Sequence, residues 1–534
     1  MQTVDSAGRP VTLVHKTFLG EGTTGPLLSQ ENLTYSERGT KAWDYTIERE
    51  VMTSSVNASG SAGPLTLTSK TRENYDDFST TALGGILGMK RLVSMTEAFN
   101  VPGQTPQTTT HTYIQSPENS ATHGRLESTI KPDGSWTFHE YNMSPSSPVS
   151  TAIEYSSWKD LSISQRTDAR KTITMVSNNE STAESYIAGT LVSKTKHTVN
   201  TELLATNEKW DGNAWHTTIT AYHPDTDPAP STGRIKWIEN SDGTATTYSY
   251  ATIGGNLVVT ERSGAGSRTA ITAGSQVRTT YNLGNFAIEE ITNDIVNNDT
   301  LGLEISRWHT DPTYNGGFDQ LGRPIKRIYN HDQDDYEIAQ YACCGLEFSR
   351  NRMGATTSYS RDGLKRVYKV ETRASDTSPS APAPAIPSPA VATFTTVDGL
   401  TTTRTRSVGT ADSVFLGSTT RSLDGLTTIT TGPALRSNLA ADRPITTSVT
   451  TRSATGDTVT TTQADGSTSI TASYLDGQTK SVSGSAVADI SYNYDIHTEN
   501  GGGEKSIVNA SGVITTTFTD LLGRTVKTES GANG

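Results

Sequence analysis

The chain alternates polar and apolar residues over short stretches, and Gly-containing turns separate these stretches. Strict alternation predicts half-buried β-strands, because successive side chains of a strand point to opposite faces. Asp-Gly between alternating stretches predicts a tight hairpin turn, since Gly adopts positive φ and Asp tolerates it. Four stretches in which Asp-Gly or Ser-Gly is followed by alternating Thr and aromatic residues are therefore predicted β-hairpins: 131–141, 240–250, 463–474 and 509–520.

A second motif, Asp-x-x-Gly-Arg, recurs at widely separated positions and leads into an alternating tail. A degenerate copy keeps the Asp and the Arg, while Arg361 replaces the preceding aromatic residue and Lys365 replaces the Gly. The motif residues are Asp5, Gly8 and Arg9, then Phe318, Asp319, Gly322 and Arg323, then Asp362 and Arg366, then Asp520, Gly523 and Arg524.

The chemistry of the copy that begins at Phe318 predicts a structural corner. Phe318 ends a strand and points into the packed face, and Asp319 accepts hydrogen bonds from backbone N–H groups two residues further on. Gly322 supplies the left-handed conformation. Arg323 begins the next strand, where its guanidinium can stack on an aromatic ring. Leu321 is expected to fill the turn with an apolar contact. No nucleophile or partner base recurs with the motif, so we expect no catalytic role.

The two motifs interlock within about twenty residues, a length that suits a repeat array. Hydrophobic residues make up 33% of the 534 residues, below the roughly 45–50% usual for globular domains. Thr is abundant and suits a pleated surface with one wet face. Few segments show the 3.6-residue apolar period of a helix. The sequence therefore predicts an all-β repeat protein.

One stretch rich in Pro, Ala and Ser, residues 374–392, interrupts this pattern. Pro cannot donate to a β-ladder and favours polyproline II, so the stretch is predicted to be a linker or an exposed loop. Residues 1–373 before it hold varied, aromatic-rich repeats, although no copy is recognisable in residues 20–110, which are predicted to be irregular. Residues 393–534 after it form a Thr-rich β-repeat region that ends in the last copy of the motif.

The net charge of −12 argues against nucleic acid as a partner, because neutralising phosphates requires a basic surface. No run of 18 apolar residues is present, so no membrane span is predicted. The sequence begins without the basic and apolar regions of a signal peptide. It also begins inside a copy of the motif, so we expect a fragment of a longer protein or a true start upstream of Met1.

Candidate chemistry is sparse. Cys343 and Cys344 are adjacent and cannot staple distant loops, so the alternatives are two reduced thiols or a strained vicinal disulfide. No Cys or His lies at ligand spacing, which predicts neither a metal site nor a cofactor. No HExxH, Gly-x-Ser-x-Gly or P-loop motif occurs, and no catalytic residue is predicted.

Aromatic residues provide the candidate ligand surface. Four Trp residues lie between residues 130 and 240, and the simplest interpretation is that they stack inside the repeats. Trp210 and Trp215 flank the sequence Asp-Gly-Asn-Ala, a predicted hairpin tip, which makes them the better candidates for exposure. An exposed pair of this kind could bind the face of a sugar.

The Asp-x-x-Gly-Arg copies at 4–9, 318–323 and 519–524 resemble the tyrosine-aspartate (YD) repeat of the Rhs family, shared by bacterial Rhs proteins, insecticidal toxin-complex shells and teneurins. The Tyr-x-Cys-Cys-Gly-Leu stretch at 341–346 is similar to large bacterial members. None of the three strict copies has Tyr at the first position. The resemblance implies β-hairpin strips that wind into an extended β-spiral or a partial hollow shell, sometimes around a cargo. The family's self-cleaving core motif has no counterpart here, so neither it nor a toxin is transferred.

We therefore expect a non-enzymatic structural or interaction segment of a secreted or cell-surface bacterial protein. Its expected partners are the remainder of a larger YD-repeat polypeptide and either cell-surface glycans or an enclosed cargo. One alternative is a carbohydrate-binding module that uses aromatic strips. A further alternative is a glycan-active enzyme whose carboxylates lie far apart in the sequence.

Overall fold

The computed structural model describes most of the chain, with gaps in loops and near both ends. The described residues are 2–4, 10–18, 25–39, 44–78, 90–116, 121–142, 149–299, 305–306, 318–330, 332–342, 344–373, 390–409, 411–434, 440–453 and 455–532.

The described residues form β-strands almost throughout. The strands up to residue 199 are β1 (Gln2–Val4), β2 (Pro10–Phe18), β3 (Leu27–Glu37), β4 (Tyr45–Val56), β5 (Ala62–Asp77), β6 (Lys90–Glu97), β7 (Gln107–Tyr113), β8 (Leu126–Ile130), β9 (Trp136–Asn142), β10 (Ser150–Ser156), β11 (Arg170–Val176), β12 (Glu180–Ile187) and β13 (Thr190–Val199). The next strands are β14 (Leu204–Trp210), β15 (Trp215–Tyr222), β16 (Ile235–Asn240), β17 (Thr244–Ile253), β18 (Asn256–Ser267), β19 (Ala270–Tyr281), β20 (Ala287–Asp294), β21 (Ile305–Ser306), β22 (Lys326–Tyr329), β23 (Asp332–Ala342), β24 (Gly345–Arg350), β25 (Thr356–Arg361) and β26 (Val367–Arg373).

The remaining strands are β27 (Val391–Asp398), β28 (Thr401–Val408), β29 (Val414–Arg421), β30 (Thr427–Thr431), β31 (Ile445–Ser453), β32 (Gly456–Thr462), β33 (Thr468–Ser473), β34 (Thr479–Ser483), β35 (Ile490–His497), β36 (Gly503–Ala510), β37 (Val513–Thr519) and β38 (Thr525–Ala532). Short 3-10 helices occur at η1 (Ile163–Asp168), η3 (Ala440–Asp442) and η4 (Glu499–Gly501). Within the described ranges no helix has the length and apolar character needed to cross a membrane.

Each strand pairs antiparallel with the next strand along the chain, from β1 with β2 to β37 with β38, so the sheet is one continuous meander. Local turn chemistry explains the hairpins. At residues 131–135, Gly134 has a φ of 81°, and the Asp133 carboxylate accepts hydrogen bonds from the backbone N–H and the hydroxyl of Ser135. The all-β prediction is confirmed.

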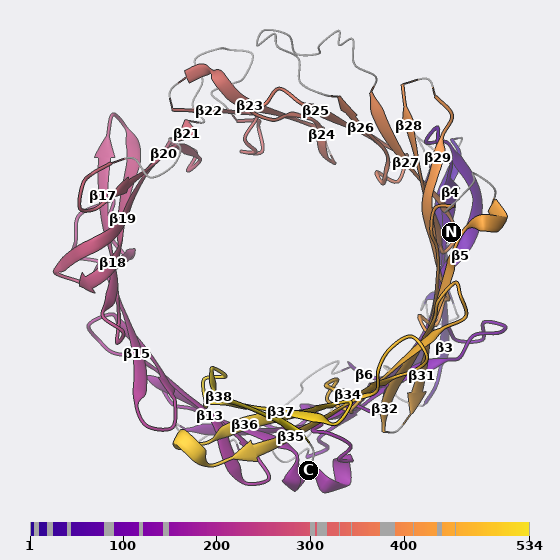
Figure 1. Cartoon of the computed structure of the whole chain (residues 1–534), viewed down its shortest axis with the longest axis horizontal. Helices are drawn as coiled ribbons and strands as arrows, with labels where there is room; N and C mark the ends of the chain where they lie inside the picture. The colour runs from indigo at the N-terminus through magenta and orange to yellow at the C-terminus, as the bar shows by residue number, and fades with distance from the viewer. Residues whose placement is uncertain are drawn as a thin grey trace.

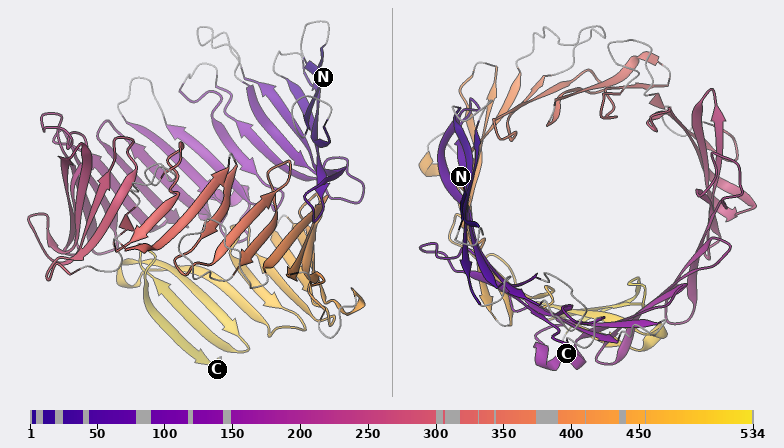
Figure 2. Two further views of the ribbon diagram at one scale, coloured as in Figure 1. Left: turned by 90° about the horizontal axis from the view of Figure 1, so that it is seen from above. Right: turned by 180° about the vertical axis from the view of Figure 1, so that it is seen from behind.

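The meander winds around an open centre (Figure 1). Its sheet does not close on itself, because its two ends lie at different heights along the axis (Figure 2). We call β1–β26 the first coil and β27–β38 the second coil. Seen from above, the second coil, orange to yellow, lies beside the first coil along the axis of the spiral (Figure 2). One bridge between strands joins the coils, Val56 of β4 with Val397 of β27. The predicted β-spiral is therefore the observed architecture.

The wall of the spiral is one sheet thick (Figures 1 and 2). Most side chains are consequently half-buried, and the buried side chains include two small clusters. The larger cluster surrounds η1 and consists of Trp136, Tyr155, Trp158, Ala169, Ile187 and Val192. A smaller cluster consists of Ile328, Tyr336 and Ile338. A Thr-rich sequence suits this wall because Thr favours strands without requiring deep burial.

Two of the predicted regions can be compared with the described strands. No repeat copy marks residues 20–110, and strands β3 to β7 in this region pair antiparallel in sequence, with bulges in the β4–β5 and β5–β6 pairs. The predicted linker at 374–392 lies mostly outside the described residues, but its last two positions, Val391 and Ala392, already belong to β27. Strands β26 and β27 pair directly, so the sheet continues across the predicted linker.

Candidate functional site: the seam between the coils

The two coils touch along a line of loop tips and strand ends that we call the seam. Its hydrogen-bonded contacts join residues that are 313 to 345 positions apart, which is the length of one circuit of the spiral. The first coil contributes Gln104, Thr105, Gln107, Lys159, Asp160, Arg170 and Asp211, and the second coil contributes Asp424, Arg452, Leu475, Asp476, Lys480, Glu504 and Arg524.

Two Asp-Gly turns of the second coil use one carboxylate for two purposes. Asp424 Oδ1 accepts the backbone N–H of Leu426 in its own turn at 3.0 Å, while its Oδ2 accepts the backbone N–H of Thr105 in the first coil at 2.9 Å. Asp476 repeats this arrangement, with Oδ1 on its own turn and Oδ2 on the N–H of Lys159 at 3.0 Å. The residue that shapes the turn therefore also connects the coils.

Charged side chains add ion pairs at the seam. Lys480 Nζ lies 2.5 Å from Asp160 Oδ2, and Arg170 Nη2 lies 2.8 Å from Glu504 Oε1. These groups are partly exposed, so each pair contributes less than a buried pair would. Their value lies in register, because each cation meets its carboxylate only when the coils are stacked in this one position.

The Asp-x-x-Gly-Arg copies form corners with one shared geometry. Asp520 Oδ1 accepts the backbone N–H groups of Leu522 and Arg524, each at 2.9 Å, and its Oδ2 accepts Arg524 Nε at 2.7 Å. Asp319 holds Leu321 N–H, Arg323 N–H and Arg323 Nε in the same way. Both carboxylate oxygens of Asp319 and of Asp520 thus accept hydrogen bonds within the corner.

Asp362 keeps this geometry without the glycine. Its carboxylate accepts the N–H and Nε of Arg366 at 2.8 and 2.7 Å, and Lys365 adopts a φ of 66° at the position where Gly322 has 75° and Gly523 has 78°. The corner is therefore specified by the Asp and Arg, and the glycine relieves backbone strain.

The guanidinium of a corner arginine also has N–H groups that can reach residues outside the corner. Arg366 Nη2 donates to the carbonyl of Ser54, 312 positions earlier, at 2.9 Å. Arg524 Nη2 reaches Asp211 of the first coil at 3.4 Å. Arg323 instead donates to the carbonyl of Ala342 at 3.3 Å and lies 4.4 Å over the Tyr341 ring. Two of the three described corners thus contact residues about one circuit away along the chain.

Burial and hydrogen bonding act in opposite directions on the seam and corner carboxylates. Burial raises the pKa of Asp424, but the Ser422 hydroxyl and the backbone N–H of Thr105 donate to it and bring its pKa below the ordinary range. The same balance lowers the pKa of Asp520, where the donors are the N–H and guanidinium of Arg524 and the N–H of Leu522. Both groups are therefore favoured as carboxylates at neutral pH.

Other predicted positions are distributed as follows. Phe318 is buried and stacks on Phe286 at 5.2 Å. Leu321 is 72% exposed, so the expected apolar contact in the turn is wrong, because the Asp319 hydrogen bonds already fix the turn and leave this side chain outside. Asp5, Gly8 and Arg9 lie outside the described residues.

Trp210 and Trp215 form a half-buried pair with ring centroids 5.4 Å apart. Their hairpin tip lies against the second coil, since a Cβ on Gly212 would come within 2.5 Å of the Gly501 carbonyl oxygen. His216 Nε2, 2.6 Å away, and two backbone N–H groups hold the pKa of Asp211, in the same tip, well below its usual range. The pair thus borders the seam.

The cysteine pair and the metal prediction concern other parts of the surface. Cys344 is exposed in the turn between β23 and β24, and Cys343 lies outside the described residues, so the vicinal disulfide stays a prediction. In the part of the chain that the structure describes, no group of three or more His, Cys, Asp or Glu side chains is arranged to hold a metal ion.

A cleft of about 470 Å³ opens beside the seam between Trp136, Arg170 and Asp476.

Sequence reasoning did not identify the seam. The Asp-Gly turns at 424–425 and 476–477 are visible in the sequence, but the residues that they contact lie 317 to 320 positions away. A local motif specifies its own turn and says nothing about which distant loop lies beside it.

No family model matches the sequence, and no curated protein matches it. Among solved structures, the chain is similar to a TcdB2-TccC3 chain, with 10% identity, a TM-score of 0.30 and coverage of 100% of this chain and 36% of that one. It is also similar to a chain of the Photorhabdus luminescens Tc holotoxin pore, with 10% identity, a TM-score of 0.26 and coverage of 95% and 32%. The chain spans about a third of the length of these chains.

Proposed function

We propose that the chain is a structural segment of a secreted or cell-surface bacterial repeat protein, in which it builds a β-spiral wall around a central space. The observation that carries this proposal is the seam. Hydrogen bonds and an ion pair between residues about one circuit apart hold the second coil against the first. Such contacts are expected if the sheet forms a wall two coils high. The partners that fit this role are the remainder of a longer polypeptide and a cargo inside the wall.

The proposed role is structural rather than catalytic. The carboxylates that recur with the motif, Asp319, Asp362 and Asp520, spend their oxygens on backbone N–H groups and on the arginine four positions later. A general acid or base needs a free oxygen that can reach a substrate. The repeated groups are therefore suited to holding corners.

Electron microscopy of the isolated chain, combined with solution scattering, tests the proposal. We expect particles with an open centre and a wall two coils high. The double variant Asp424→Ala/Asp476→Ala removes the carboxylates that connect the coils and should give a larger radius of gyration. Asp465→Ala is the matched control, because Asp465 lies in an Asp-Gly turn and accepts hydrogen bonds from the backbone N–H and the hydroxyl of Ser467 in that same turn. Compact wild-type particles without an open centre would refute the proposal.

A further inference from the structure

Three neighbouring loop tips of the first coil carry large aliphatic side chains that are mostly exposed. Leu283 is 92% exposed, Leu321 is 72% exposed and Ile253 is 62% exposed. Single exposed aliphatic residues are common on protein surfaces and need no explanation. These three lie at successive tips of one edge, and we call them the apolar rim.

The meander places the apolar rim on the edge of the wall opposite the seam. Turns of an antiparallel meander alternate between two edges, and the first-coil tips of the seam follow β6, β10 and β14. Ile253 ends β17, Leu283 lies in the turn after β19, and Leu321 lies in the corner between β21 and β22, so all three lie on the other edge. The Phe286 ring stacks on Phe318 at 5.2 Å and brings the last two tips together. Neighbouring tips are two strands apart, roughly 10 Å at about 4.8 Å per strand.

The turns that carry the apolar rim present no unpaired charge. Residues 251–257 and 281–287 contain no charged side chain. In the corner at 318–324, the Asp319 carboxylate pairs with the Arg323 guanidinium at 2.6 Å, so the two charges neutralise each other. The Asn282 side chain accepts the backbone N–H of Phe286 at 3.0 Å within its own turn. Polar groups of these tips are therefore used inside the tips.

The tips of the seam show how this molecule contacts protein. Leu475 is buried there, and beside it Asp476 accepts the backbone N–H of Lys159 from the other coil. A seam tip thus combines an aliphatic residue with a hydrogen-bonding group for its partner. The apolar rim has the aliphatic residues without a free charged group, and its side chains stand on separate tips. A fluid apolar phase can surround each tip, whereas a folded protein surface would have to be shaped to all three.

We propose that the apolar rim inserts its three aliphatic side chains into the surface of an uncharged phospholipid bilayer. Removing three such side chains from water gives an affinity on the order of 10³–10⁴ M⁻¹, close to that of a single myristoyl chain. The net charge of −12 opposes attraction to anionic lipids, so zwitterionic lipids are the favoured surface. This function is additional to the scaffold, and its failure would leave the spiral and the seam unaffected.

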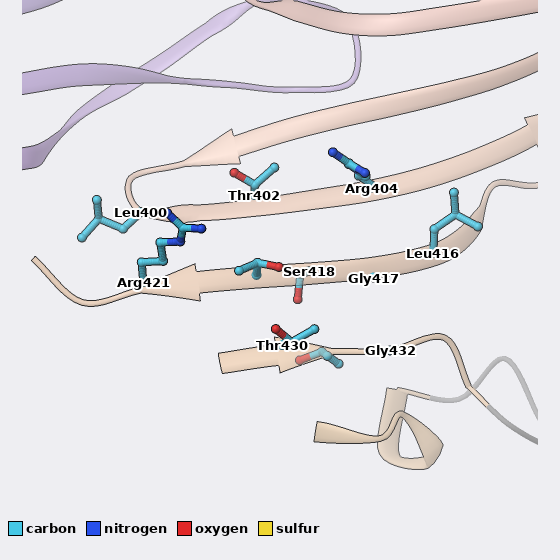
Figure 3. A pocket seen from close by; sticks show the side chains of 11 residues that line it. Leu400, Thr402, Arg404, Leu416, Gly417, Ser418, Arg421, Thr430 and Gly432 are labelled. Atoms are coloured by element: carbon cyan, nitrogen blue, oxygen red, sulfur yellow. The ribbon is translucent and has the colours of Figure 1, made fainter. Parts of the chain in front are cut away.

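Exposed arginines on the second coil offer a different route to a membrane, through its phosphate groups. Figure 3 shows Arg404 and Arg421 among the residues that line a groove of about 660 Å³ over β28, β29 and β30. A guanidinium binds phosphate through its charge, so binding by this route would weaken as salt rises. Insertion of aliphatic side chains does not rely on charge, and salt therefore separates the two routes.

Flotation of the full chain with phosphatidylcholine vesicles tests the proposal. We expect binding that persists as sodium chloride is raised. Leu283→Ser or Leu321→Ser should weaken binding about tenfold, since one buried aliphatic side chain corresponds to about one decade of affinity. Met353→Ser is the matched control, because Met353 is 82% exposed at the turn after β24, on the other edge of the wall.

A fluorescent side chain reports insertion directly. With vesicles, Leu283→Trp should shift its emission to the blue and be quenched by brominated acyl chains, whereas Met353→Trp should show neither effect. The chain already contains 7 Trp residues, so the difference from the wild type gives the signal of the added side chain.

The proposal is overturned if phosphatidylcholine vesicles do not bind, if Met353→Ser weakens binding as much as Leu283→Ser, or if the double variant Arg404→Gln/Arg421→Gln abolishes binding. Self-association measured by sedimentation without lipid, and lost in Leu283→Ser, would assign the apolar rim to an interface with a second copy and would also overturn it. Unchanged thermal unfolding of the variants establishes that they remain folded.

Discussion

The aspartates of the corners and of the seam turns use their two oxygens for different partners. Asp520 uses one oxygen for two backbone N–H groups of its corner and the other for the Arg524 guanidinium. Asp424 uses one oxygen for its own turn and the other for the first coil. Hydrogen bonds to a charged acceptor stabilise by about 1.5–3 kcal/mol each. The Asp424 carboxylate therefore holds both its own turn and a contact with the first coil.

Asp520→Ala should destabilise the last corner by about 2 kcal/mol, since it leaves two backbone donors and a guanidinium without their acceptor. Hydrogen exchange should accelerate at the amides of Leu522 and Arg524. Asp489→Ala, which changes an exposed loop aspartate, provides the control. Equal protection in the two variants would show that the carboxylate does not hold the corner.

The glycine position of the corner separates backbone strain from steric overlap. Gly523→Ala should cost about 1 kcal/mol, because a Cβ there meets open space and only the positive φ is unfavourable. Gly322→Ala should cost more, because its Cβ would overlap the Phe286 ring. Lys365→Gly should stabilise by about 0.5 kcal/mol, since relief of strain exceeds the added freedom of the unfolded chain. Denaturant midpoints measure all three, and a reversed order of the two Ala variants would contradict this explanation.

At the scale of single residues, turn chemistry is predictable and side-chain direction is less so. An Asp followed by Gly one or three positions later indicates its own hydrogen bonds, because these bonds are made within four residues. The direction of Leu321 depends on which face of the corner is covered, and this depends on strands elsewhere. Its exposure could not be read from the local motif.

At the scale of elements, the hairpins are the predictable unit. Asp-Gly turns between alternating stretches mark β8–β9 and β16–β17 at their observed positions. Strands β3 to β7 carry no such turn signal and instead hold cross-strand ion pairs, such as Arg72 with Glu48 and Lys70 with Glu50. Pairs of this kind are visible only once the register is known. For that reason the pairing of these strands could not be predicted from the sequence.

The stability of the seam should depend on pH, because the hairpin tip at Asp424 contributes an ionised carboxylate to it. The folded-state pKa of Asp424 lies below its value in the unfolded chain, which is about 3.9. Its contribution to stability is therefore complete above about pH 4 and is lost as the pH falls towards the folded-state pKa. The thermal unfolding midpoint of the wild type should fall more steeply below pH 4 than that of Asp424→Asn. Parallel curves would show that this carboxylate does not stabilise the seam in its ionised form.

At the scale of the whole molecule, the sheet becomes a spiral because its second coil stacks on its first. The resemblance to YD repeats implies a spiral, whereas composition and periodicity establish only an all-β repeat protein. The number of residues in one circuit, and hence the partners across the seam, depends on the accumulated twist of many hairpins. Small differences in each hairpin add up over a circuit, so Lys159 and Asp476 could not be paired from the sequence.

The central claim is that the coils stack in this register, and zero-length carbodiimide cross-linking tests it most directly. The reagent joins a lysine amine to a carboxylate in contact, and the pair Lys480–Asp160 spans 320 positions. Lys194–Glu184, a contact within one hairpin at 2.8 Å, is the internal control. Mixing isotopically labelled and unlabelled chains identifies links between molecules. We predict both links within single chains. A Lys194–Glu184 link without a Lys480–Asp160 link would contradict the stacked spiral.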